Sequence, residues 1–217
     1  GVRVSDGCPT SSFRDLVEQV AELGYVNRWH NLLYRGQGRD YGDRNGRSAI
    51  YPTIYRPDPG RRQLRSQTLN ARFELLDAFV HQLREHRSDL SDRAGLWRFP
   101  EYQIALLQHY GLCDTPLLDL THSLRVAATF ALLDSETGRA DRPEGYVFAL
   151  GMPYPSGSVT HVVDQGLVLV KLQAICPPEA LRPHFQEGWL AGRLPSTSAK
   201  ERGDNAARRL LGKYRLD

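Results

Sequence analysis

One stretch constrains the fold of this chain more than any other, because polar residues and glycine stand there between two apolar segments. It covers residues 108–123, QHYGLCDTPLLDLTHS, and follows the apolar residues 104–107. A second apolar segment covers residues 126–133. A plain connection needs about four to six residues and none of this chemistry. Because loops on a rigid scaffold concentrate binding and catalytic groups, the stretch predicts one wall of a functional site where two buried elements meet.

The spacing of apolar residues predicts the elements around this stretch. Positions three and four apart predict helices over residues 13–24 with a serine cap, over 66–87 and over 100–109. A further helix is expected to begin after Thr121 or Ser123, either of which can cap it, and to run to residue 133. Short β-forming runs predict strands over residues 29–34, 145–150, 160–163 and 167–172.

The other segments are expected to connect or end these elements. The expectations are an exposed loop over residues 37–48, an extended segment over 51–56, a polar connection over 88–98, a strand or a loop over 184–191, and a helical or frayed tail from Ala199. We therefore predict an α+β fold, in which a helical N-terminal two thirds packs on a mixed or antiparallel C-terminal sheet.

The chain has 217 residues of uniform globular composition, which predicts a single domain over residues 1–217. Its core is expected at residues 30–190, with an N-terminal helix within 1–29 and a charged tail at 199–217. No apolar run approaches the roughly 20 residues that a membrane helix requires, so no membrane segment is expected.

Three widely spaced cysteines, Cys8, Cys113 and Cys176, lack metal-ligand spacing. Together with the absence of a secretory signal, they lead us to expect a cytoplasmic protein with no disulfide framework and no metal site. Cys113 could be a nucleophile, but a small buried hydrophobic side chain is the favoured interpretation.

Arginine dominates the basic residues, since the lysines are Lys171, Lys200 and Lys213. Guanidinium groups suit phosphate through paired hydrogen bonds, although a solvated arginine-rich surface is an equal alternative. The arginines that recur through residues 35–72 include Arg35, Arg39, Arg44, Arg47, Arg56, Arg61, Arg62, Arg65 and Arg72.

Arg35 is the first candidate site residue, within Tyr34-Arg35-Gly36-Gln37 at the end of a predicted strand. An arginine at the end of a strand can direct its guanidinium group toward a cleft, while the glycine lets a ligand approach the backbone. The structural alternative is an arginine that bonds a carboxylate within a hairpin.

The stretch 108–123 supplies further candidates. Asp119 could cap the following helix, bind loop amides or hold His109. His109 could act as a general base, contact a ligand or be a satisfied core histidine. Thr121 and Ser123 offer hydroxyl groups at a helix N-terminus, where free N–H groups and the helix dipole favour anions, and simple capping is the alternative.

A late segment adds Gln186 and Glu187, just before Trp189. On its own this pair is typical of an exposed polar turn that precedes a buried tryptophan. It gains meaning from the order of the other segments along the chain.

Together these segments resemble the FRG domain family, which takes its name from a Phe/Tyr-Arg-Gly motif. Residues 34–37 match that motif, and residues 108–121 match a middle motif that reads roughly Gln-His-x-Gly-Leu-x-Thr-Arg-Leu-Leu-Asp-Trp-Thr. The resemblance covers residues 30–190 and extends to Tyr51-Pro52, Arg56, the alanine- and phenylalanine-containing residues 127–131, and Arg182 with Gln186, Gly188 and Trp189.

Two positions depart from the middle motif. Pro116 stands where the family commonly has arginine, and Leu120 stands where it commonly has tryptophan. If that arginine contacts ligand in relatives, Arg56 or Arg125 would have to supply the charge here. Because some family members occur near bacterial anti-phage systems, the resemblance implies a toxin or an anti-phage defence effector.

The order of the motifs is also similar to that in ADP-ribosyltransferases. Those enzymes carry an arginine or histidine on an early strand against NAD, then a strand with a Ser-Thr-Ser-like segment that leads into an alanine-containing helix, and then a late Gln-x-Glu or Glu. In this chain Arg35, residues 119–131 and residues 186–188 follow in that order. Because position 188 is glycine, the carboxylate would have to come from Glu187 or Asp119.

This second resemblance implies a split sheet and an NAD-dependent ADP-ribosyltransferase or NAD glycohydrolase, with NAD as its substrate. A carboxylate would stabilise the positive charge that builds on the ribose as the nicotinamide bond breaks, and arginine would hold the pyrophosphate. A tyrosine would stack on nicotinamide. The residues implied as catalytic are Arg35, His109, Asp119, Gln186 and Glu187. Those implied as NAD-binding are Tyr34, Arg35, Gly36, Gln37, Arg56, Tyr110, Thr121 and Ser123.

Two other functions fit the same residues. The arginines, Tyr51, Tyr55 and a His–Asp pair would serve a nucleic-acid-binding or nucleic-acid-processing module, whose affinity would fall steeply with salt. A non-catalytic sensor that recognises a small ligand or a phage protein is the other alternative. The acceptor of any modification, protein or nucleic acid, stays open, as does a fused or adjacent partner domain.

Overall fold

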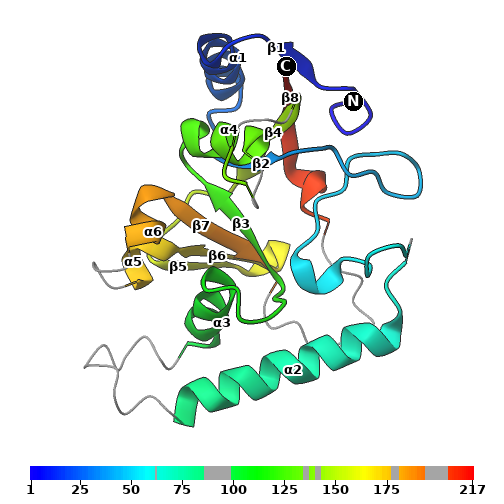
Figure 1. Cartoon of the computed structure of the whole chain (residues 1–217). Coiled ribbons are helices and arrows are strands. Elements are labelled where there is room, and N and C mark those ends of the chain that lie inside the picture. The colour runs from blue at the N-terminus through cyan, green and yellow to red at the C-terminus, as the bar shows by residue number, and fades with distance from the viewer. Residues whose placement is uncertain (62, 86–98, 134–136, 140–142, 177–180, 194–204) are drawn as a thin grey trace.

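The computed structural model describes residues 1–61, 63–85, 99–133, 137–139, 143–176, 181–193 and 205–217, and within them the chain forms one eight-stranded mixed sheet with helices against it (Figure 1). The α+β prediction is confirmed. The strands lie in the order β1 (Cys8–Thr10), β8 (Leu210–Leu216), β4 (Gly145–Met152), β2 (Asn31–Gln37), β3 (Leu117–Thr121), β7 (Gly188–Gly192), β6 (Leu167–Lys171) and β5 (Val159–Val162). Neighbouring strands are antiparallel, apart from the parallel pair β1–β8.

All four predicted helices are confirmed in position. They are α1 (Phe13–Val26), α2 (Ser66–Glu85), α3 (Pro100–His109) and α4 (Leu124–Leu132). Two short helices, α5 (Leu172–Ile175) and α6 (Leu181–Phe185), lie between β6 and β7 in the chain. The described residues also form the 3₁₀ turns η1 (Thr53–Tyr55), η4 (Val163–Gln165) and η5 (Ala206–Arg209).

Local chemistry sets the ends of these helices. Ser12 caps α1, its hydroxyl oxygen accepting from the Asp15 amide at 3.1 Å. Of the two predicted caps for α4, Ser123 is the one used, because its hydroxyl accepts from the Val126 amide. After α3 the chain turns at Gly111, whose φ of 65° lies in the left-handed region that favours glycine.

The sheet is split between β2 and β3. Within these two strands one residue pair, Tyr34 with Thr121, is in register, whereas β2 pairs with β4 over seven positions and β3 pairs with β7 over five. The result is two four-stranded halves, β1-β8-β4-β2 and β3-β7-β6-β5. One buried cluster joins them, in which Phe148 and Leu33 of the first half share a core with Trp189 of the second.

Helices cover each half separately. Leu16 of α1 and Ala127 of α4 are buried with Val147 and Tyr214 of the first half. Leu69 and Leu76 of α2 and Leu107 of α3 are buried with residues of β6 and β7 in the second half. Figure 1 shows this division, with α1 and α4 near the two chain ends and α2 at the opposite end of the molecule.

Several local expectations were wrong. Residues 210–216 form the strand β8 rather than a helical or frayed tail, because Leu210 is buried in one core cluster with residues of β4, and Tyr214 and Leu216 are buried in another with α1. Residues 53–55 form a 3₁₀ turn instead of an extended segment. Strand β2 continues past its expected end through Gly36, which pairs with Val147.

Other segments add detail that the pattern left open. Residues 117–121, within the stretch taken as a wall between two elements, form the inner strand β3. The segment 184–191 contains the end of α6 and most of β7. Three strands, β1 to β3, come from the first two thirds of the chain, so the sheet is not built from C-terminal residues alone. Residues 88–98 and 199–204 lie outside the described part of the chain.

Gly36 is where helix α4 lies against β2. A Cβ atom at Gly36 would lie 1.8 Å from the main-chain oxygen of Ala127, and one at Gly145 would lie 2.5 Å from that of Ala131. The small residues on strand and helix therefore allow the two backbones to meet. The side of Gly36 on which a Cβ atom would stand is therefore occupied by the backbone of α4.

Gly36→Ala should destabilise the protein, because the new methyl group meets rigid backbone. We expect a loss of about 3 kcal/mol in the free energy of unfolding, at the upper end of the usual cost of overpacking. Urea titration followed by circular dichroism measures it.

Gly24→Ala is the matched control, since Gly24 lies within α1 and a Cβ there meets its nearest neighbour at 3.7 Å. This change should stabilise by about 1 kcal/mol, because alanine favours helix over glycine. Equal stabilities of the two variants would contradict the contact between α4 and β2.

Candidate functional site

A cleft of about 2170 Å³ opens where β2 and β3 separate. Its walls come from β2, the described residues between 38 and 69, the end of α3, β3, the second half of α4 and the α6–β7 turn. The expected site residues that line it are Tyr34, Arg35, Gly36, Gln37, Arg56, His109, Tyr110, Asp119, Thr121 and Gln186. Glu187 and Ser123 are not among the lining residues.

Arg35 bridges the split in the sheet. Its Nη1 donates to the main-chain oxygen of Asp119 at 2.7 Å, and its Nε donates to Oε1 of Gln37 at 2.9 Å. Burial lowers the pKa of the guanidinium to about 10, with Asp119 opposing the shift and Arg56 adding to it. Arg35 therefore remains charged at neutral pH. The hairpin alternative does not hold, since the oxygen it bonds on β3 belongs to the backbone.

The Asp119 carboxylate is held by two residues of the same motif. The hydroxyl of buried Thr115 donates to Oε1 of Gln108 at 2.5 Å, and Nε2 of Gln108 donates to Oδ2 of Asp119 at 2.7 Å. Because a carboxylate oxygen accepts, the end of the amide that faces Asp119 must be the NH2 group, and the amide oxygen is then left to accept from the Thr115 hydroxyl. Of the roles considered for Asp119, capping the next helix is excluded, since Ser123 does this.

The sequence pattern does not single out Gln108 and Thr115 as site residues. Both belong to the motif of residues 108–121, and that membership was the available signal. Their role depends on a contact between the last turn of α3 and a strand eleven residues further along, which no periodicity reveals.

His109 is buried at the end of α3 yet lines the cleft, with its ring centroid 5.2 Å from that of Tyr110. Burial lowers the pKa of the imidazole, and the positive charge of Arg182 lowers it further, while Asp119 raises it. The ring is therefore neutral at pH 7 and able to accept a proton. Asp119 acts on His109 through its charge.

Thr121 ties the late segment to β3. Its hydroxyl donates to the main-chain oxygen of Gln186 at 2.6 Å and accepts from the amide of Ser123 at 2.9 Å. The hydroxyl is thus engaged within the protein, and it positions Gln186 at the cleft.

Glu187 follows at a sharp turn. Its φ of 45° is the sole positive value at a non-glycine among the described residues, and its main-chain oxygen accepts from the amide of His122 at 3.3 Å. Burial lowers the pKa of His122, and Glu187 opposes that shift, so the two side chains lie near one another. Asp119, not Glu187, supplies a carboxylate to the cleft lining.

The cleft is strongly basic. Seven arginines line it against two aspartates, Asp43 and Asp119, which is a net charge of +5 with His109 neutral. The arginines are Arg35, Arg39, Arg44, Arg56, Arg61, Arg65 and Arg182.

Arg72 does not belong to this group. It pairs with Asp58 at 2.8 Å and Asp114 at 3.4 Å, and it donates to three main-chain oxygens between residues 53 and 56. Its role is to fasten the segment that carries Arg56 onto α2, rather than to meet a ligand. Arg47 is not a lining residue, and Arg62 lies outside the described residues.

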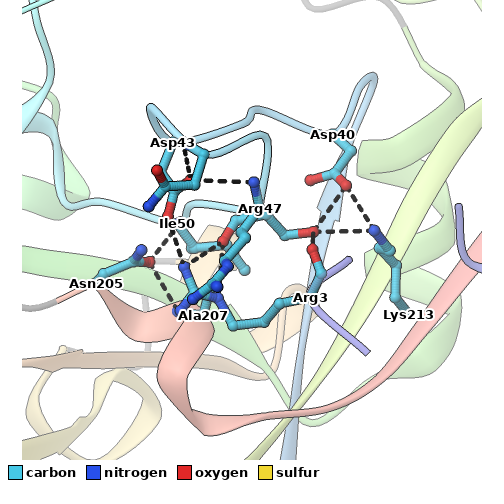
Figure 2. A network of polar contacts seen from close by, with 10 residues as sticks. Arg3, Asp40, Asp43, Arg47, Ile50, Asn205, Ala207 and Lys213 are labelled. Atoms are coloured by element: carbon cyan, nitrogen blue, oxygen red, sulfur yellow. Dashed lines mark hydrogen bonds and ion pairs between the residues drawn. The ribbon is translucent and has the colours of Figure 1, made fainter. Parts of the chain in front are cut away.

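The wall that carries Arg39 and Arg44 is fixed to the sheet by a polar network (Figure 2). Buried Lys213 of β8 donates to Asp40 at 2.7 Å and to the hydroxyl of Ser48 at 2.9 Å. Arg3 pairs with Asp43 at 3.2 Å, and Asn205 accepts from the amide of Ile50 at 2.9 Å. Since breaking a buried pair leaves an uncompensated charge, these contacts hold the loop against the core.

The two departures from the motif sit inside the protein. Leu120 is buried in the cluster that joins the two halves of the sheet, and Pro116 is buried directly before β3. Of the two arginines considered as replacements for the missing charge, Arg56 lines the cleft and Arg125 does not.

Cys113 is half-buried, and burial raises the pKa of its thiol, with Asp114 adding to the shift. A raised pKa disfavours the thiolate, which is the nucleophilic form.

Among the described residues there is no cluster of three or more His, Cys, Asp or Glu side chains able to hold a metal ion. In the same part of the chain, no helix has the length and apolar character needed to span a membrane.

The charges around His109 predict how its titration responds to substitution. Arg182→Ala should raise the pKa of His109, because it removes a positive charge that disfavours protonation, and Asp119→Asn should lower it further. Two-dimensional NMR of the imidazole protons against pH measures both shifts. Arg14→Ala, at an exposed position on α1, is the control and should leave the curve unchanged. An unmoved titration in Arg182→Ala would contradict the proximity of the two residues.

Comparison with known proteins identifies the family of this site. The family model described as the FRG domain matches residues 30–139, which include β2, α3, β3, α4 and the middle motif. A search of curated proteins and a search of solved structures each gave no match. The Tyr-Arg-Gly segment and the hydrogen-bonded residues Gln108, Thr115 and Asp119 lie within the matched region. The protein therefore belongs to the FRG domain family.

Proposed function

We propose that this FRG domain is an ADP-ribosyltransferase-like enzyme that binds NAD in the cleft at the split of the sheet. The observation that carries the proposal is that three segments far apart in sequence meet there. Arg35 of β2 contacts the backbone of Asp119 on β3, and Thr121 of β3 contacts Gln186 before β7. This is the set of segments whose order is similar to that of the transferase motifs.

Arg35 would bind the pyrophosphate of NAD. Its Nε and Nη1 are used within the protein, and Nη2, which bonds to none of the residues that the structure describes, would donate to a phosphate oxygen. Arg56 also lines the cleft, and its positive charge is felt at Arg35. Two guanidinium groups and one carboxylate that line the same cleft suit a ligand with two phosphates and a ribose.

The Asp119 carboxylate would stabilise the transition state. When the bond between the ribose C1′ and the nicotinamide nitrogen breaks, the electron pair leaves with nicotinamide and positive charge develops on the sugar. A carboxylate that is already oriented costs no reorganisation at that moment, and Gln108 supplies the orientation. Tyr110 is 57% exposed and lines the cleft, so its ring face is accessible for stacking on nicotinamide.

Neutral His109 would accept the proton of the attacking group. With water as that group the product is ADP-ribose and the enzyme is an NAD glycohydrolase, and with another nucleophile it is a transferase. Either reaction consumes NAD, which is how such a domain would act as a toxin or an anti-phage effector.

Nicotinamide release from NAD by the purified protein tests the proposal. Asp119→Asn should lower the rate about 10²–10³-fold, the usual effect of removing one preorganised electrostatic group. Arg35→Lys should lower it less than Arg35→Ala, because lysine keeps the charge and loses the fork. Glu18→Gln, on the exposed face of α1, is the carboxylate control and should keep the rate.

Two outcomes would contradict parts of this proposal. A greater loss in Glu187→Gln than in Asp119→Asn would move the carboxylate role to Glu187. No nicotinamide release by the wild-type protein, with lysate protein, oligonucleotides or water as the acceptor, would exclude the transferase and favour a binding or sensor domain.

A further inference from the structure

The charge of the cleft exceeds what NAD requires. Its pyrophosphate carries two negative charges, whereas seven arginines and two aspartates give the cleft a net charge of +5. Asp43 is moreover paired with Arg3, and Asp119 is bound by Gln108. Unneutralised positive charge held in one cleft favours a second, more highly charged anion.

The surplus charge lies on one wall. Arg39, Arg44, Arg61 and Arg65 are exposed and come from the described residues between 39 and 65. Arg61 approaches one carboxylate, that of Asp58, at 4.0 Å, and Arg72 already occupies Asp58 at 2.8 Å. The exposed side chains of Arg44, Arg61 and Arg65 are therefore open to solvent or to a ligand.

Aromatic rings alternate with the arginines on this wall. Tyr41 and Tyr51 line the same cleft, and the guanidinium of Arg39 lies 4.5 Å from the centre of the Tyr41 ring. Tyr55 also lines the cleft, but its ring packs edge-on against Phe73. Arginines that follow a phosphate backbone, with aromatic rings on which unpaired bases stack, are the features of a surface that binds single-stranded nucleic acid. The polar network of Figure 2 fixes the part of the wall that carries Tyr41 and Arg44.

We propose that the acceptor is a single-stranded nucleic acid, held along this wall with one base directed toward Asp119 and His109. The inference rests on the proposed function and names its substrate. An acidic protein would use the charge but not the rings, and double-stranded DNA would not offer its bases for stacking.

The bond from C1′ to the nicotinamide nitrogen breaks, and nicotinamide leaves as a neutral molecule with the electron pair. A base nitrogen that bears hydrogen forms the new bond to C1′ and gives its proton to His109, which releases it to solvent. The products are the ADP-ribosylated strand, nicotinamide and one proton.

Fluorescence anisotropy with labelled single-stranded DNA and RNA tests the binding surface. The triple variant Arg44→Gln/Arg61→Gln/Arg65→Gln should weaken binding about 100-fold at 0.1 M salt and reduce the slope of log K against log salt by about 2, the effect of losing three phosphate contacts on a single strand. Double-stranded DNA of the same length should bind more weakly than the single strands.

A second triple variant, Arg14→Gln/Arg125→Gln/Arg208→Gln, makes the same change in net charge at exposed arginines outside the cleft lining. It should keep both the affinity and the salt slope, and melting curves of the two variants should match that of the wild type. The inference would be overturned if the two triple variants lost affinity equally, or if the variant of Arg44, Arg61 and Arg65 (the cleft variant) kept its affinity.

Incubation with NAD labelled in the adenine ring tests the transfer itself. We expect label on single-stranded oligonucleotides, lost in the cleft variant while nicotinamide release to water continues. Nicotinamide release with label on protein alone would overturn the acceptor inference and leave the proposed function standing. Absence of nicotinamide release with every acceptor would overturn both.

Discussion

The site depends on a junction in the sheet that is held by very little backbone pairing. Strands β2 and β3 meet at Tyr34 and Thr121 and then separate, and Arg35 spans the gap to the main-chain oxygen of Asp119. A fully paired sheet would leave no cleft at this point, and a junction without the arginine would leave the two halves joined mainly by the core around Phe148 and Trp189. The separation of β2 and β3 therefore both opens the cleft and places Arg35 in it.

Each of the three consecutive residues of the Tyr-Arg-Gly motif makes a different contact at this junction. Tyr34 makes the single pairing to Thr121, Arg35 makes the bridge, and Gly36 makes room for the backbone of α4 at Ala127. Because side chains alternate along a strand, neighbouring residues face opposite sides, so the motif can serve the cleft and the helix layer at once.

Local elements could be predicted from the sequence where the pattern was long and regular, as in the four helices and β4. The strand β8 could not, since its residues include a buried lysine, Lys213. Asp40, far back in the chain, neutralises that charge, and the hydroxyl of Ser48 accepts a further hydrogen bond from it. For the site, the sequence predicted many of the residues that line the cleft, but not what each of them contacts. That Asp119 is held by Gln108 and Thr115 follows from a contact between α3 and β3, and contacts of that kind depend on the assembled fold.

The contacts of Arg35 and Asp119 determine at which of the two residues a substitution can change the chemistry without changing the fold. Arg35 both holds the junction and offers its charge to a ligand, so any substitution there changes the cleft as well as its contents. At Asp119 the two roles belong to different atoms, because the main-chain oxygen makes the bridge and the carboxylate, held by Gln108, is left for chemistry. Replacing the carboxylate by an amide leaves the bridging oxygen in place. Loss of activity at Asp119 with unchanged stability would therefore report on chemistry, whereas the same loss at Arg35 would not.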